Sequence, residues 1–144
     1  MPKITGITHW ALGVNDLAES ERFYTDVVGL EPRGRLNPQL SCFRVCGLDI
    51  LLCEQPAPPA TEHGLVHHSF TLEPDEWERA AKHLLDKGVR PDPIVYRERG
   101  YFTGRELYFA DPSGNRLEFR DPTWTPGMPT PTLEEVVGAQ SGVR

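Results

Sequence analysis

Hydrophobic and polar residues alternate along much of the chain, and two stretches instead show the apolar stripe of an amphipathic helix. In its first part, the pattern predicts a strand over residues 4–14, a helix through about Val28, and strands at Leu40–Val45 and Leu48–Glu54. Asn15 or Asp16 is placed to cap the helix, and Gly29 to end it. The predicted order is therefore strand, helix, then strands.

The second part of the chain repeats this order. It contains a strand at Val66–Leu72, a helix from Asp75 to just before Gly88, a strand at Ile94–Arg97 and a hairpin over 107–119. Such an internal repeat predicts two related modules. The expected organisation of the single domain is module one at about 4–54, a proline-rich linker at 55–64, module two at about 65–120 and a proline-rich tail at 121–144, with regular structure expected only from Leu133.

The hairpin of the second module contains a carboxylate between apolar neighbours. Asp111-Pro112-Ser113-Gly114 has the residue order of a tight turn in which glycine takes a positive φ. A turn of this kind pairs Asp111 with Asn115 and puts Tyr108 opposite Glu118. On this hairpin alone, Glu118 fits a solvated strand residue as well as a functional one.

The repeat places two histidines at matching points of the two modules. His9 and His67 each precede a small residue by two positions, Ala11 in the first module and Ser69 in the second. If the two strands converge, His9, His67 and Glu118 form a facial triad for a divalent metal, with coordination positions left open. The alternative is that each histidine is a hydrogen-bonded structural residue. A one-residue slip in register would exchange His67 for His68.

Composition limits the classes of partner. The 144 residues contain 15 Lys and Arg against 21 Asp and Glu, for a net charge of −6, and no basic run. This argues against nucleic acid and anionic membranes as partners. No apolar run is long enough to cross a bilayer or to act as a signal core, so a cytoplasmic location is expected.

Taken together, residues 4–120 resemble the vicinal oxygen chelate superfamily, which includes glyoxalase I, extradiol dioxygenases, fosfomycin resistance proteins and bleomycin-binding proteins. The resemblance rests on His9-x-Ala-Leu-x-Val-x-Asp-Leu, Phe23-Tyr24-x4-Gly29-Leu30, His67-x-Ser-Phe-x-Leu and Asp111-Pro112-x-Gly114-Asn115-x-x-Glu118. It implies an α+β fold of two βαβββ modules that form an open curved mixed sheet around a metal ion held by His9, His67 and Glu118. Fe(II) or Mn(II) is the expected ion, with Zn, Ni and Mg as alternatives, and a homodimer is expected.

Within that superfamily, the hairpin most resembles extradiol dioxygenases. Their pattern of an aliphatic residue, Tyr, Asp-Pro-x-Gly and Glu matches Leu107-Tyr108 through Glu118, which implies that Tyr108 orients a catecholate substrate. The histidine that the pattern requires upstream is absent, and Arg99, Tyr101 and Arg105 are candidate substitutes as substrate contacts.

Other members of the superfamily match less well at single positions. The apolar stretch Ile50–Cys53 argues against the fourth ligand of glyoxalase I, and Ala11 replaces a hydroxyl residue usual in fosfomycin resistance proteins. A glyoxalase- or epimerase-type lyase or isomerase and a non-enzymatic dimeric ligand- or drug-binding protein remain the alternatives.

Overall fold

Residues 1–56 and 65–141 are described by the computed structural model, and they fall into two units. The first unit holds residues 1–56 and 111–115, and the second holds residues 65–110 and 116–141. Each unit contains one four-stranded sheet. Most of the predicted linker, at 57–64, lies outside the described residues.

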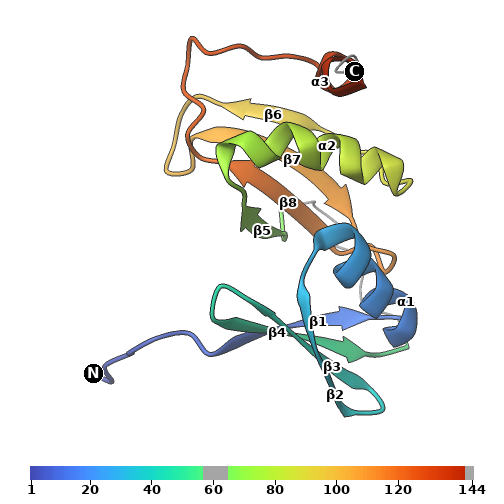
Figure 1. Ribbon diagram of the computed structural model, residues 1–144. Coiled ribbons are helices and arrows are strands. Elements are labelled where there is room, and N and C mark those ends of the chain that lie inside the picture. Colours follow the sequence, from blue (N-terminus) through green and yellow to red (C-terminus); the bar gives the residue numbers. More distant parts are fainter. Residues whose placement is uncertain (57–64, 142–144) are drawn as a thin grey trace. The chain divides into compact units, whose positions relative to one another are not determined.

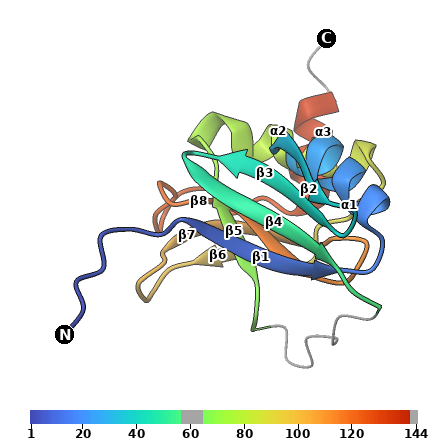
Figure 2. The ribbon, with the colours of Figure 1, turned by 90° about the horizontal axis from the view of Figure 1, so that it is seen from below.

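The first unit has the predicted order of elements and one additional strand. Its elements are β1 (His9–Val14), α1 (Leu17–Phe23) continued by a π-helical turn (Tyr24–Val28), β2 (Glu31–Asn37), β3 (Leu40–Val45) and β4 (Leu48–Glu54). The strands lie in the order β1-β4-β3-β2, with β1 parallel to β4 (Figure 2). The predicted bounds of β3 and β4 are confirmed.

The helix of the first unit begins and ends as its sequence indicates. The Asp16 carboxylate accepts a hydrogen bond from the backbone N–H of Glu19 at 2.8 Å, so Asp16 rather than Asn15 is the N-cap. Gly29 ends the helical segment with a φ of 85°, a conformation that glycine adopts without strain. Both predicted helix signals are therefore confirmed.

Two strands of the first unit differ from the prediction. β1 begins at His9 rather than at residue 4, because its parallel partner β4 begins at Leu48 and His9 already pairs with Asp49. β2 was not predicted, because all its residues are exposed and its sequence shows no apolar alternation. It contains Pro32 and irregular register, both typical of an edge strand.

The second unit repeats this arrangement. Its elements are β5 (His68–Thr71), a 3-10 turn (Pro74–Glu76), α2 (Trp77–Asp86), β6 (Ile94–Arg97), β7 (Gly104–Ala110), β8 (Arg116–Asp121) and α3 (Leu133–Ser141). The sheet order is β5-β8-β7-β6, with β5 parallel to β8. Figure 1 shows α2 lying across one face of this sheet. The predicted fold of two βαβββ modules is confirmed.

The two faces of the second sheet have different roles. On α2, Trp77, Ala81 and Leu84 are fully buried, and the helix contacts β8. Leu117 and Phe119 of β8 are also buried, so apolar packing covers this face of the hairpin. Because side chains alternate along a strand, Glu118 and Arg120 point to the opposite face.

The proline-rich tail packs on the second unit. The indole of Trp124 is buried, and its ring centroid lies 5.3 Å from that of Tyr96, which lies 6.3 Å from that of Trp77. The Tyr96 hydroxyl donates to the backbone carbonyl of Pro131 at 2.5 Å, and α3 contacts α2. The tail therefore extends the apolar core on the α2 side of the sheet and leaves the other face uncovered by α3.

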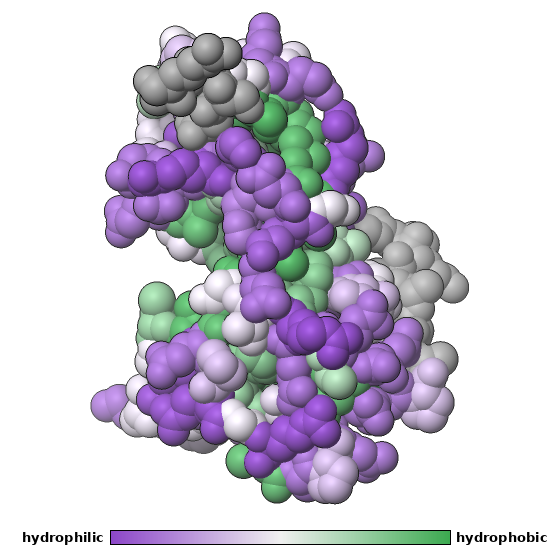
Figure 3. Space-filling view, turned by 45° about the vertical axis from the view of Figure 1, so that its right-hand side comes forward, coloured by the Kyte–Doolittle hydropathy of each residue, from purple (hydrophilic) through white to green (hydrophobic). Residues whose placement is uncertain are grey.

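The surface of each unit is mainly polar, in keeping with a mean hydropathy of −0.44. In Figure 3, hydrophilic residues cover most of the visible surface and apolar residues form smaller patches. None of the helices among the described residues is both long enough and apolar enough to span a membrane.

Candidate metal and substrate site

The β7–β8 hairpin positions Glu118, and its predicted register is confirmed. Tyr108 pairs with Glu118 across the two strands. In the turn, the backbone N–H of Asp111 donates to the carbonyl of Asn115 at 2.9 Å, and Gly114 has a φ of 87°. One carboxylate is thereby held at a fixed point on the sheet face opposite α2.

Glu118 is buried, which excludes the alternative of a solvated strand residue. Its exposed fraction is 2%, and its Oε2 lies 3.0 Å from Nε2 of His67. Its other oxygen, Oε1, is buried and has no hydrogen-bond partner among the residues that the structure describes. A buried carboxylate oxygen without a partner is costly for the protein alone, and such an oxygen is typical of a site that receives a ligand.

His67 is oriented for the same site. Its Nδ1 lies 2.8 Å from the carbonyl oxygen of Leu65, and because a carbonyl only accepts, Nδ1 carries the proton of this hydrogen bond. The other ring nitrogen, Nε2, then faces the Glu118 carboxylate. Two electron-rich atoms at 3.0 Å require a proton or a cation between them. A metal-ligating histidine usually donates its second ring N–H to an oxygen in this way.

Tyr108 lies beside this pair, but its hydroxyl is directed elsewhere. Its ring meets His67 edge-on at a centroid distance of 5.6 Å. The hydroxyl donates to Oε2 of Glu106 at 2.9 Å. Burial, and then the hydrogen bond to Glu106, raise the pKa of Tyr108 to about 12, so the phenol stays protonated at neutral pH. The tyrosine can therefore donate a proton or a hydrogen bond but is not a base.

The buried Glu106 and the partly exposed Arg97 form a network that the sequence interpretation missed. Arg97 donates from Nε to Oε1 of Glu106 at 2.7 Å and from Nη2 to Oε2 at 3.0 Å. Glu106 is 1% exposed, and this pairing raises the pKa of Arg97. A signal was present, because alternation along β7 puts Glu106 on the same face as Tyr108.

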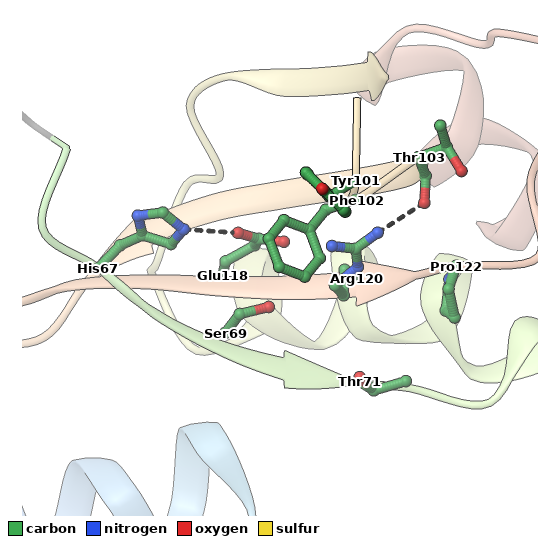
Figure 4. A pocket seen from close by; sticks show the side chains of 9 residues that line it. All are labelled: His67, Ser69, Thr71, Tyr101, Phe102, Thr103, Glu118, Arg120 and Pro122. Carbon is green, nitrogen blue, oxygen red and sulfur yellow. Dashed lines mark hydrogen bonds and ion pairs between the residues drawn. The ribbon is translucent and has the colours of Figure 1, made fainter. Parts of the chain in front are cut away.

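A pocket of about 490 Å³ opens beside His67 and Glu118 on this face of the sheet. Figure 4 shows the side chains around it; the residues are His67, Ser69, Thr71, Tyr101, Phe102, Thr103, Glu118, Arg120 and Pro122. Of the three candidate substrate contacts named from sequence, Tyr101 lines it. Arg99 does not, and Arg105 instead forms ion pairs with Asp121 and Glu78.

His9 lies in the first unit, whereas His67 and Glu118 lie in the second. It is exposed at the start of β1, with its Nδ1 3.0 Å from the Thr8 hydroxyl. The described residues of one chain contain no cluster of three or more His, Cys, Asp or Glu side chains arranged to hold a metal. The structure therefore brings two of the three predicted ligands together.

Comparisons with known proteins identify relatives of the whole fold. The family model described as Glyoxalase/Bleomycin resistance protein/Dioxygenase superfamily matches residues 6–119. Glutathione transferase FosA of Serratia marcescens is 28% identical over 121 residues, which cover 80% of this chain and 79% of that protein.

Solved structures agree on the fold. The integron cassette protein HFX_CASS4, from the mobile metagenome of Halifax Harbour sewage outfall, is 32% identical, with a TM-score of 0.66, and the match covers 82% of this chain and 99% of that one. A mutant of the fosfomycin resistance protein FosX from Listeria monocytogenes, complexed with Mn(II) and 1S,2S-dihydroxypropylphosphonic acid, has a TM-score of 0.69 at 23% identity. That match covers 83% of this chain and 93% of that one.

Proposed function

The chain belongs to the Glyoxalase/Bleomycin resistance protein/Dioxygenase superfamily, and on that premise we propose that it is a divalent-metal-dependent enzyme that binds a small substrate through adjacent oxygen atoms. The proposal assigns His67 and Glu118 as two protein ligands of the ion and His9 as the third. The observation that carries it is the buried Oε1 of Glu118, which has no partner among the described residues, in a carboxylate whose Oε2 lies 3.0 Å from His67 Nε2.

The three proposed ligands, His9, His67 and Glu118, suit a divalent metal ion. Two imidazoles and one carboxylate bind Fe(II) and Mn(II), with Zn, Ni and Mg as alternatives, and three protein ligands leave positions open for substrate oxygens. When bound, a divalent ion here polarises the substrate oxygens as a Lewis acid. The chain's own part is to orient His67 through Leu65, to bury the carboxylate and to hold the substrate in the pocket.

The position of His9 leads to a proposal about assembly. His9 is exposed in the first unit, so its imidazole is free to reach a site completed by a second copy of the chain. We propose a homodimer in which His9 of one copy joins His67 and Glu118 of the other.

This arrangement is tested by mixing two inactive variants, His9→Ala and Glu118→Ala. Each homodimer should lose its metal, because each site lacks one ligand. A mixed dimer, formed by refolding the two chains together, should recover one intact site that contains His9 from one chain and Glu118 from the other. The measurement is bound Mn(II) per dimer by elemental analysis after separation of differently tagged chains.

The wild-type protein carried through the same refolding is the control, with an expected two ions per dimer. If the mixed dimer binds no metal, each site is built within one chain or His9 is not a ligand. If wild-type protein binds no stoichiometric metal, the proposed enzyme class itself is wrong.

For the reaction, the relationship to FosA favours metal-assisted transfer to an oxygenated electrophile. FosA is named a glutathione transferase, and a divalent ion at this site would polarise a substrate oxygen that gains charge as the thiol attacks. The expected result is thiol consumption, without oxygen uptake, when the Mn(II) protein receives glutathione and a panel of small epoxides that includes fosfomycin. Ala11 predicts that fosfomycin is a poorer substrate than other epoxides.

The second candidate is an extradiol dioxygenase-like reaction, favoured by the edge-on packing of Tyr108 on His67 and its place opposite Glu118. It makes the opposite prediction for the same preparation loaded with Fe(II): oxygen uptake and a ring-cleaved chromophore with catechols. Thiol transfer without any catechol cleavage contradicts the dioxygenase, and catechol cleavage without thiol transfer contradicts the transferase.

A further inference from the structure

Arg120 is a buried arginine in the wall of the pocket, and the protein leaves most of its guanidinium unused. It lies on β8 two residues after Glu118, on the same face, and its exposed fraction is 9%. Its Nη2 donates to the backbone carbonyl of Thr103 at 2.6 Å, and its Cζ lies 5.4 Å from the ring centroid of Phe102. In Figure 4 the guanidinium lies among the side chains that line the pocket, between the Phe102 ring and Thr103.

The described residues, 1–56 and 65–141, do not supply an anion for this cation. Glu106, which pairs with Arg120 across the strands, is ion paired with Arg97 instead. Glu118 contacts Nε2 of His67 at 3.0 Å, and among the residues that the structure describes no carboxylate lies within salt-bridge distance of Arg120. Buried arginines are rarely left without an anion, because the cost of removing the charge from water is not recovered.

We propose that Arg120 binds a carboxylate of the substrate and so determines the specificity of the site for anionic molecules. This inference rests on the proposed function, since the substrate's adjacent oxygens are held at His67 and Glu118. The neutral hydroxyls of Ser69 and Thr71, on the neighbouring strand, face the same space and can donate to the anion.

The geometry indicates the class of substrate. Residues two apart on a strand are separated by about 7 Å, so the carboxylate lies several bonds from the chelating oxygens. One guanidinium matches the single charge and planar shape of a carboxylate, because its N–H groups form a flat fork. The substrate is therefore a small monoanionic carboxylate with adjacent oxygens at its other end, and a pocket of about 490 Å³ is large enough to hold it.

The experiment compares two probes that differ in one charge. Under anaerobic conditions, the Mn(II)-loaded protein is titrated calorimetrically with 3,4-dihydroxybenzoate and with its methyl ester, which offers the same adjacent oxygens without the anion. Wild-type protein should bind the acid about tenfold or more tightly than the ester, as expected for a charge-assisted hydrogen bond. Arg120→Gln should reduce this ratio to about one while ester affinity stays within about twofold.

Arg79→Gln is the matched control, because it removes a guanidinium from the exposed surface of α2, and the acid-to-ester ratio should stay at the wild-type value. Equal binding of acid and ester by wild-type protein overturns the assignment, as does an unchanged ratio in Arg120→Gln. If Arg120→Gln also fails to bind the methyl ester or Mn(II), Arg120 is a structural residue that anchors Thr103, and the inference is wrong. Wild-type protein that binds no Mn(II) overturns the proposed function itself, which distinguishes the two failures.

Discussion

Replacing Glu118 by Leu should lower the affinity for Mn(II) by about 100-fold or more and at the same time make the metal-free protein more stable. The affinity falls because one of three charged or imidazole ligands is lost. The stability rises, by about 1 kcal/mol, because the variant no longer buries a carboxylate whose Oε1 has no partner in the part of the chain that the structure describes. Metal titration and urea unfolding in the presence of a chelator measure the two effects separately.

Glu106→Leu provides the contrast, because Glu106 is equally buried but fully engaged by Arg97 and Tyr108. That variant should lose about 2 kcal/mol of unfolding free energy, since the buried Tyr108 hydroxyl loses its acceptor. If the two variants change the free energy of unfolding in opposite directions, Glu118 is a ligand-binding group, whereas Glu106 is a structural residue. If Glu118→Leu is destabilised as much as Glu106→Leu, Glu118 has a structural role.

The structure of the β7–β8 hairpin could be predicted because it depends on residues that are close in sequence. Asp111-Pro112-Ser113-Gly114 determines the turn, the turn determines the register, and the register places Tyr108 opposite Glu118 as predicted. The repeat predicted two related modules of strand, helix and strands for a similar reason, since each module has its own apolar pattern, and the resemblance to the superfamily implied the βαβββ order. These features depend on residues that are close in sequence.

Features that depend on distant residues were not predictable in the same way. Arg97 and Glu106 meet only because β6 pairs with β7. Among the described residues, Arg120 lacks an anionic partner only because the nearby carboxylates of Glu106 and Glu118 contact Arg97 and His67 instead. β2 escaped prediction because an exposed edge strand has no buried face to show a pattern. His9 lies in a different unit from His67 and Glu118, and in the proposed homodimer its place in the site depends on assembly, which no local pattern encodes.

The second large effect is expected at the Arg97–Glu106 pair. Arg97→Leu should lower the free energy of unfolding by about 3 kcal/mol, because it leaves a carboxylate that is 1% exposed without its cation. The estimate lies at the lower end of the range for a broken buried ion pair, because the Arg97 side chain is itself 42% exposed and water can enter the space it leaves. Equilibrium urea unfolding of the metal-free protein measures the loss.

The double variant Arg97→Leu/Glu106→Gln separates the cost of the orphaned charge from the cost of lost packing. A neutral amide at position 106 can still accept the hydrogen bond from Tyr108, so at least half of the lost stability should return. If Arg97→Leu also weakens Mn(II) binding and the double variant restores it, this network positions Tyr108 and His67 for the site, given their edge-on contact. A double variant no more stable than Arg97→Leu would mean that the arginine stabilises the sheet through its aliphatic packing rather than through its charge.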